Sequence, residues 1–368
     1  MTEAPVLSLR TLNRTLRERQ LLARRASLSV LEAVERLVAV QGQEPNWPYV
    51  GLWTRLDDFR HDDLTSLLHN RSVVRGPLLR STQHLVSAED FLWLRPLVQP
   101  ILDRTLRSAY FARATAGIDL AELAEAGRKR LAGRTLARPQ LGRLLAEHFP
   151  GRVGGVLAAA AQLQVPLVHP PPGGTWGGWG NRGAVPCALA EEWIGRPIAA
   201  SPRVETMIVR YLAAFGPASV KDVQTWSGLT RLRGVVDDLR PRLGVFRDER
   251  GKELFDLPDA PLADPGLPVP VRFLPAFDNL LLGHADRTRV ISDEDRKRVM
   301  PGGAMVRPTF LVGGFVRGVW SLEGSTLLVS PFRPLSKAET AALTEEAERL
   351  LAFVAADADS RDVRFARP

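Results

Sequence analysis

The chain has 368 residues, of which 45% are hydrophobic and 24% are charged, and its net charge is +8. This length is too great for one compact core and predicts two or three domains. The composition is typical of a soluble globular protein, and the apolar runs stop short of the roughly 18 residues that a membrane span needs. A single cysteine, Cys187, excludes an internal disulfide, and the N-terminus lacks a secretory signal pattern. We therefore expect a cytoplasmic protein that has no membrane partner.

The basic residues are nearly all arginine, since only five of the 49 are lysine. A planar guanidinium matches the oxygens of a phosphate, and a basic surface favours a polyanion, most often nucleic acid. A genome of high GC content also enriches a protein in arginine and alanine without any functional reason. The composition alone leaves both explanations open.

Residues 1–110 form the first predicted unit. An amphipathic helix is expected over residues 9–22, and a second over "LSVLEAVERLVAVQ", with Ser27 or Ser29 as its cap. A third helix is expected over residues 49–56. The stretch "SVVRGPLLRSTQHLV" alternates like a two-stranded hairpin. Helices followed by a two-stranded wing predict a winged helix.

Residues 111–200 repeat this order, with helices expected over residues 120–131, 139–148 and 153–163. The stretch "VPLVHPPPGGTWGGWG" then predicts a strand, a Pro/Gly loop and a return strand. The glycine-rich "GTWGGWGNRG" resembles a phosphate cradle only superficially. We interpret it as a loop that faces DNA or a neighbouring domain.

Residues 201–262 show the pattern most clearly. The helix "VETMIVRYLAAFG" is followed by a second helix with Ser219 as its cap, a third with Thr230 as its cap, and a hairpin around Asp-Glu-Arg-Gly. Residues 263–368 instead predict a β-rich unit that ends in a helix over residues 337–356. The expected fold is α+β: three tandem winged-helix motifs followed by a β-rich C-terminal unit.

The chain contains no P-loop, no dinucleotide-binding fingerprint and no Cys/His spacing typical of a metal site. We therefore predict neither a cofactor nor a metal. The most unusual polar feature is "VAVQGQEPNWPYVGLW", in which Gln41 and Gln43 stand where an apolar helix meets a turn rich in tryptophan and proline.

Five motifs occur in the order "VQGQ", "GLWTRL", "VVRGPLLRSTQHLV", "RYLAAFGPASVKDVQTWSGL" and "LPAFDNLLLGHADRTRV". Together they resemble the winged-helix DNA glycosylases of the AlkZ/YcaQ type, over about residues 7–320. The resemblance implies three winged helices and a β-rich part in a C shape around DNA. It also implies a catalytic Gln-X-Gln motif, here Gln41 and Gln43, as in the AlkZ branch. Members of that branch excise bulky DNA adducts of alkylating natural products, often as self-resistance proteins.

Two neutral amides suit this chemistry. A purine alkylated at N7 is already cationic, so it can leave without a strong general acid. One glutamine carbonyl can orient water toward the anomeric carbon, and the other can lie against the developing oxocarbenium charge. Neither amide takes up a proton at neutral pH, so the expected catalysis is positional and electrostatic. Glu44 is adjacent and ionisable, but the resemblance gives it no role.

Further polar and aromatic residues are candidates for contact with DNA or the lesion. They are Trp47, Arg75, Arg80, His84, Lys221, Arg231, Arg233, Asp278, Asn279, His284 and Arg287. The alternative for Trp47 is core packing, and for His84 it is burial with its hydrogen bonds satisfied. For the group at 278–287 the alternative is a buried polar network that joins the C-terminal unit to the helices.

We therefore predict a monofunctional DNA glycosylase that removes bulky N7-alkylated purines, interstrand crosslinks included, from double-stranded DNA. We expect a monomer that is associated with the nucleoid. The first alternative is a non-catalytic winged-helix DNA-binding protein, such as a transcriptional regulator, and the second is a protein that binds other proteins through its wings.

Overall fold

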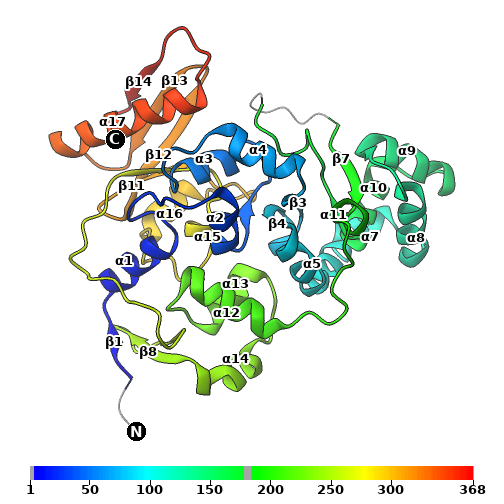
Figure 1. Ribbon diagram of the computed structural model, residues 1–368, viewed down its shortest axis with the longest axis horizontal. Coiled ribbons are helices and arrows are strands. Elements are labelled where there is room, and N and C mark those ends of the chain that lie inside the picture. The colour runs from blue at the N-terminus through cyan, green and yellow to red at the C-terminus, as the bar shows by residue number, and fades with distance from the viewer. Residues whose placement is uncertain (1–3, 178–183, 368) are drawn as a thin grey trace.

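The computed structural model describes residues 4–177 and 184–367. The same connectivity occurs three times along the chain: a helix, a short strand or bridge, two helices and a hairpin (Figure 1). In each case the short first strand pairs with the last strand of the hairpin. This is the connectivity of a winged helix, and a mixed five-stranded sheet follows the three modules. An α+β fold is thus confirmed.

The first module follows an N-terminal strand and helix, β1 (Val6–Leu7) and α1 (Leu9–Arg19). It consists of α2 (Val30–Leu37), β2 (Val40–Gln41), α3 (Trp47–Trp53), α4 (His61–His69), β3 (Val73–Pro77) and β4 (Gln83–Ser87), with a short 3-10 turn (Leu79–Ser81) between the last two. The sheet order is β2-β4-β3, and both pairings are antiparallel. Ser29 caps α2 in a reciprocal capping box with Glu32, as one of the two predicted caps.

The second helix is shorter than predicted. It ends at Leu37, because Val38 adopts a left-handed φ of 66° that an α-helix cannot continue. Val40 and Gln41 instead form β2. The prediction that Gln41 lies at a helix end is therefore wrong. The prediction also missed α4, a short helix with few apolar residues.

Three helices connect the first module to the second: α5 (Ala88–Leu97), α6 (Gln99–Leu106) and α7 (Ala109–Ala114). The second module contains α8 (Leu120–Leu131), β5 (Leu136–Ala137), α9 (Arg138–His148), α10 (Gly154–Gln164), β6 (Leu167–Val168) and β7 (Pro186–Leu189), and α11 (Ala190–Ile194) follows. Its three predicted helices are confirmed within a residue. Part of the Gly-rich loop, residues 178–183, lies outside the described residues.

The third module contains α12 (Val204–Phe215), α13 (Val220–Ser227), α14 (Arg233–Leu239), a 3-10 turn (Arg240–Arg242), β8 (Gly244–Asp248) and β9 (Glu253–Asp256). Ser219 caps α13, as predicted. Thr230 does not cap the next helix, because Arg231 has a φ of 61° and the helix starts only at Arg233. The N-terminal β1 pairs in parallel with β8 and so attaches the start of the chain to this wing.

The C-terminal unit is built on a sheet of order β10-β11-β12-β13-β14. Its elements are β10 (Arg272–Leu274), α15 (Asn279–Leu282), α16 (Asp293–Val299), β11 (Thr309–Val312), β12 (Phe315–Glu323), β13 (Thr326–Pro331), α17 (Lys337–Val354) and β14 (Asp362–Phe365). The predicted terminal helix is confirmed. It connects β13 to β14, which run parallel.

Two hydrophobic clusters run across the module boundaries. One joins the helices of the second and third modules with α5 and α6, and the other joins the first module to the C-terminal sheet and α17. The first and second modules also meet directly at Gly76 of β3. A Cβ there would lie 2.9 Å from the carbonyl oxygen of Leu167 in β6, so glycine permits this close approach.

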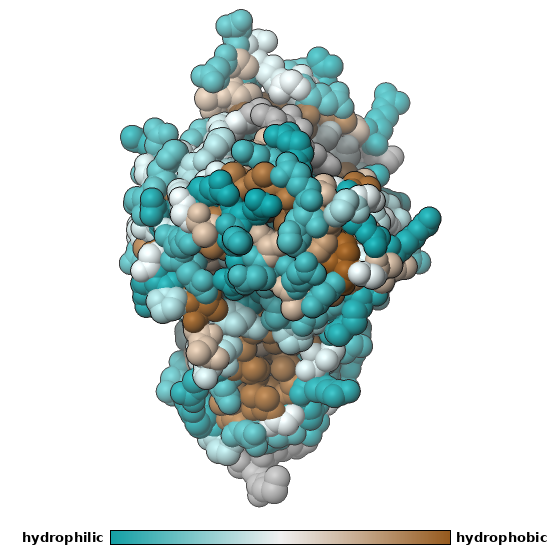
Figure 2. Space-filling model, turned by 90° about the vertical axis from the view of Figure 1, so that its right-hand side faces the viewer, coloured by the Kyte–Doolittle hydropathy of each residue, from teal (hydrophilic) through white to brown (hydrophobic). Residues whose placement is uncertain are grey.

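The face that carries the second module is mostly hydrophilic, with hydrophobic side chains in separate patches (Figure 2). Among the described residues, no helix is both long and apolar enough to cross a membrane.

Candidate active site

The Gln-X-Gln motif forms a tight turn at the end of β2. Gln41 pairs with His84 across the sheet, and the backbone N–H of Gly42 donates to the carbonyl of Gln83 at 2.8 Å. The side-chain Oε1 of Gln41 accepts from the backbone N–H of Gln43 at 2.8 Å. The Oε1 of Gln43 in turn accepts from the backbone N–H of Gln83 at 3.2 Å. Both amides are thus oriented by backbone N–H groups.

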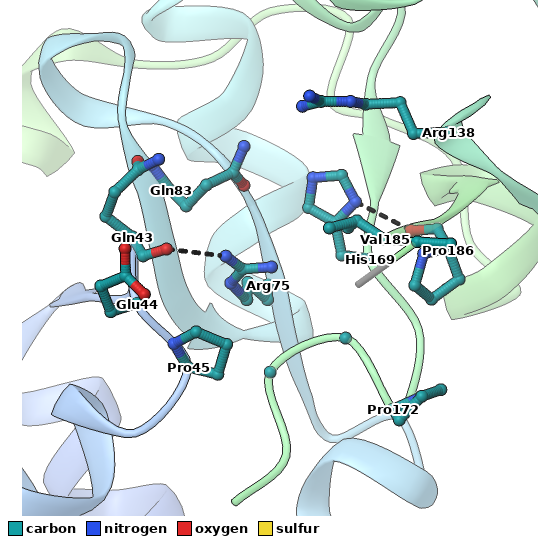
Figure 3. Close-up of a pocket in the computed structure, with 13 residues that line it drawn as sticks. Gln43, Glu44, Pro45, Arg75, Gln83, Arg138, His169, Pro172, Val185 and Pro186 are labelled. Atoms are coloured by element: carbon teal, nitrogen blue, oxygen red, sulfur yellow. Dashed lines mark hydrogen bonds between the residues drawn. The ribbon is translucent and has the colours of Figure 1, made fainter. Parts of the chain in front are cut away.

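Arg75 holds this turn from the neighbouring strand β3. Its Nε donates to the carbonyl of Gly42 at 2.8 Å, and its Nη2 donates to the carbonyl of Gln43 at 3.1 Å (Figure 3). Burial lowers the pKa of Arg75 to about 10, although Glu44 opposes the shift, so the guanidinium stays charged at neutral pH. Arg75 was predicted as a candidate for contact with DNA or the lesion. The structure instead shows that Arg75 is buried. Its guanidinium forms a fork of two hydrogen bonds to the backbone carbonyls of the motif.

The loop of the second module is attached to the other side of the motif. Asn46, three residues beyond Gln43, exchanges two hydrogen bonds with the backbone of Gly177, at 2.7 and 3.1 Å. The adjacent Trp176 stacks on His61 at a centroid distance of 4.1 Å and also contacts Tyr49. A Cβ on Gly174, whose φ is +112°, would lie 2.9 Å from Cδ of Arg75. Glycine therefore lets the loop pass directly over the fork.

A pocket of about 440 Å³ lies between the first and second modules. Its first-module wall carries Gln43, Glu44, Arg75 and Gln83, and the opposite wall carries Arg138 and His169 (Figure 3). Pro45 and residues 172–174 and 184–186 complete the lining. The pocket thus joins an amide of the motif to basic side chains from two modules.

His169 is a lining residue that the sequence reasoning missed. Its ring is buried, and Nδ1 lies 2.9 Å from the carbonyl oxygen of Pro186. Burial lowers its pKa to about 3, and Arg75 adds to the shift, so the imidazole is neutral at neutral pH. The only available signal was a histidine at the end of a predicted strand, before the proline run.

The two amides do not share a cavity. Gln43 is exposed and lines the large pocket, whereas Gln41 is buried and lines a cavity of about 20 Å³ behind it. Gln20, Arg55, Asp278 and Asn279 also line this small cavity. Its volume suits one water molecule, and the Oε1 of Gln20 has no hydrogen-bond partner among the described residues.

Of the candidates at 278–287, three are buried and bonded to other parts of the fold, and one arginine is partly exposed. Asp278 forms a bidentate ion pair with Arg55 at 2.8 and 2.9 Å. Asn279 donates to the carbonyl of Ala39 at 2.5 Å. His284 is buried with Nε2 3.1 Å from the carbonyl of Phe215, and burial lowers its pKa to about 3.

These contacts correct the prediction that Asp278, Asn279 and His284 meet DNA. They form the alternative, a buried polar network between the C-terminal unit and the modules. Arg287 is partly exposed, and burial of its guanidinium lowers its pKa.

Three first-module candidates also point inward. The ring of Trp47 packs edge-on against Trp320 of β12 at a centroid distance of 5.7 Å. Trp47 therefore packs against the hydrophobic core. Arg80 donates to the carbonyl of Trp226 at 2.5 Å and to Oδ1 of Asn279 at 3.2 Å, which links three parts of the fold. His84 is fully buried with Nδ1 3.0 Å from the carbonyl of Thr82, and burial lowers its pKa to about 3. Trp47 and Arg80 are thus partly buried by these contacts, and His84 is fully buried.

The third-module candidates are exposed. Lys221 lies in the first turn of α13, Arg231 precedes α14, and Arg233 begins it. Nη1 of Arg233 lies 3.7 Å from Oε2 of Glu253 and 3.8 Å from Oδ1 of Asp237. A role of these residues in phosphate contact stays a prediction.

The chemistry of the site is that of neutral amides and cations, with one carboxylate. Within residues 4–177 and 184–367, no group of three or more His, Cys, Asp or Glu side chains could hold a metal ion. The Gln43 amide can hydrogen-bond a water or a sugar, and Glu44 can lie near positive charge. Arg138, exposed at the pocket edge, can meet a phosphate.

Comparison with known proteins points to one family. The model of the family described as "DNA glycosylase AlkZ-like" matches residues 34–353. A curated relative, the interstrand DNA cross-link repair glycosylase of Streptomyces sahachiroi, is 29% identical over 150 residues, which span 39% of this chain and 40% of that protein. The solved structure of the Streptomyces sahachiroi DNA glycosylase AlkZ superposes with a TM-score of 0.80 at 23% identity, covering 98% of this chain and 100% of that one.

The last comparison supports the fold, and the family model covers most of the chain, including Gln41, Gln43 and Arg75. This chain therefore belongs to the AlkZ-like family of DNA glycosylases.

Proposed function

We propose that this protein is a monofunctional glycosylase that hydrolyses the N-glycosidic bond of an N7-alkylated purine in double-stranded DNA and leaves an abasic site. The observation that supports it most directly is Gln43 at the edge of a pocket of about 440 Å³, with its backbone carbonyl held by Arg75 and its side-chain amide oxygen held by the N–H of Gln83. Bulky adducts belong to the proposed substrates, and so do interstrand crosslinks, by analogy with the cross-link repair glycosylase of Streptomyces sahachiroi.

In this proposal, the two glutamines have different roles. Gln43 faces the pocket, so its amide orients the attacking water toward the anomeric carbon. Gln41 is buried in the separate small cavity and accepts from the N–H of Gln43, so it fixes the turn that presents the Gln43 amide. Glu44 lines the same pocket, where its negative carboxylate stabilises the positive charge that develops on the sugar. The leaving base is already cationic, and no side chain of the motif has to protonate it.

Several broader proposals accompany this one. The four units are residues 1–110, 111–200, 201–262 and 263–368, arranged in a C shape around DNA. The protein acts as a monomer in the cytoplasm, close to the nucleoid, and protects its host from a DNA-alkylating natural product. The three repeated winged-helix connectivities and the net charge of +8 support DNA binding.

The test uses a duplex with a single N7-methylguanine. Single-turnover incubation is followed by heat and alkali, which cleave the strand at abasic sites. We expect strand scission with the wild type and a loss of about 10²-fold in rate for Gln43→Ala, as for other positioning groups. Lys337→Ala, which alters an exposed side chain at the start of α17 and leaves the pocket untouched, serves as the control.

Scission at the wild-type rate in both Gln41→Ala and Gln43→Ala would refute the role of the motif. Tight, salt-sensitive duplex binding without any scission by the wild type would favour the non-catalytic DNA-binding protein instead.

A further inference from the structure

The second-module wall of the pocket carries a histidine with a fixed tautomer. The backbone N–H of His169 donates to the carbonyl of Arg75 at 2.8 Å, which places the ring opposite the motif. Nδ1 lies 2.9 Å from the carbonyl oxygen of Pro186. A carbonyl only accepts hydrogen bonds, so Nδ1 carries the hydrogen and Nε2 carries the lone pair.

The Nε2 atom is turned toward the part of the pocket that carries Gln43 and Gln83 (Figure 3). Within residues 4–177 and 184–367, no side chain or backbone N–H donates to it. Burial lowers the pKa of His169 to about 3, so Nε2 stays unprotonated and keeps its lone pair at neutral pH. Among the described residues, Nε2 of His169 is therefore a hydrogen-bond acceptor without a donor.

The facing wall also carries an acceptor without a donor. The Oε1 of Gln83 is buried and has no hydrogen-bond partner among the described residues. Nε and Nη2 of Arg75, in contrast, donate to the carbonyls of Gly42 and Gln43. Nε2 of His169 and Oε1 of Gln83 are thus two acceptors of this pocket without a donor among the described residues, and they fit a ligand edge that is rich in N–H groups.

We propose that His169 is a specificity-determining residue whose Nε2 accepts a hydrogen bond from the 2-amino group of an N7-alkylated guanine. This rests on the proposed function. Guanine presents two adjacent donors, N1–H and the 2-amino group, which match the two unpaired acceptors on His169 and Gln83. Adenine presents a single amino group on the same edge, beside an acceptor nitrogen. Alkylation at N7 makes the base cationic and its N–H groups stronger donors.

The test compares two duplexes that differ only in the 2-amino group, one with N7-methylguanine and one with N7-methylhypoxanthine. Each single-turnover release rate is divided by the spontaneous rate of the same base. We expect the wild type to prefer guanine about tenfold, the effect of one buried hydrogen bond. His169→Phe, which fills the site without an acceptor, is expected to lose this preference by slowing guanine release alone. His169→Gln retains an acceptor oxygen and is expected to restore much of it.

His148→Phe is the matched control, because His148 lies at the end of α9 and pairs with Glu122 at the surface. A His169→Phe variant that keeps the wild-type preference, or that slows both substrates equally, overturns the assignment. A wild type that releases both bases at equal rates overturns it without any variant, even if the Phe variant fails to fold. A wild type that releases neither base overturns the proposed function itself, and this inference with it.

Discussion

The fork of Arg75 provides the sharpest test of how the active-site turn is held. Arg75→Met keeps an apolar stem of similar length but removes both donors to the carbonyls of Gly42 and Gln43. Arg75→Lys keeps the charge, but one ammonium lacks the planar fork that reaches both carbonyls. Because the turn carries the Gln43 amide, both variants should act on catalysis as well as on stability.

The magnitude follows from the two contacts. A hydrogen bond to a charged group contributes about 1.5–3 kcal/mol, so the loss of both costs roughly 3–6 kcal/mol at a fully buried site. Water in the adjacent pocket can reach the freed carbonyls, so the lower end of that range, about 3 kcal/mol, is expected for Arg75→Met. A shift of the amide by about 1 Å should lower the excision rate roughly 10²-fold.

Urea denaturation gives the stability change, and single-turnover release of N7-methylguanine gives the rate. Arg138→Met is the control, since Arg138 is the exposed arginine on the opposite wall of the same pocket. Its free energy of unfolding should change by less than about 0.5 kcal/mol. If Arg75→Met retains the wild-type excision rate, the fork does not position the motif, and the reasoning fails.

Three further predictions follow from the site and its surroundings. Gln41→Ala should lower the free energy of unfolding by about 1–3 kcal/mol, because it leaves the N–H of Gln43 unpaired, whereas the exposed Gln43→Ala should leave it almost unchanged; urea denaturation of both variants compares them directly. Gly42→Ala should be tolerated and should stabilise the fold by about 0.4–1 kcal/mol, because its φ is not left-handed and a Cβ would meet only ordinary contacts, the nearest at 3.5 Å; a lower melting temperature would contradict this. His84, His169 and His284 have folded-state pKa values of about 3, below the usual 6.5, so the unfolded chain binds more protons than the folded one between pH 6.5 and 3, and stability falls as pH falls through this window. The loss should be about 1.4 kcal/mol per pH unit for each histidine, or about 4 kcal/mol between pH 6 and 5 for the three, and an unfolding free energy that is flat across that interval would show that the rings are not held neutral.

The sequence predicted those parts of the fold that depend on local patterns. Helices with strong apolar periodicity, such as α8 to α10 and α17, appear where they were expected, and so does the cap at Ser219. It failed where the local signal is weak or misleading. The run "LVAVQ" suits a helix or a strand equally well, and the left-handed Val38 that decides between them has no sequence signature.

The candidate site was predictable only in part, because burial decides which polar residues can act. The resemblance identified Gln41 and Gln43, but it could not show that they lie in different cavities. Arginine content favoured a nucleic-acid surface, yet several arginines are buried on carbonyls and carboxylates: Arg14, Arg17, Arg19, Arg55, Arg75, Arg95, Arg272 and Arg289. Net charge therefore overstates the basic surface. His169 was missed because its partners lie on segments distant in sequence.

The buried arginines also explain why a single motif requires so large a fold. The turn of Gln41 and Gln43 is held by Arg75 in front and by the loop of the second module beside it. Behind it, Asn279 of the C-terminal unit binds the carbonyl of Ala39, and Arg80 connects Asn279 to Trp226 of the third module. In the proposed mechanism, neutral amides act through position rather than through proton transfer, so their rate enhancement depends on how rigidly they are held. A catalyst that lacks a strong acid or base needs this support from every module.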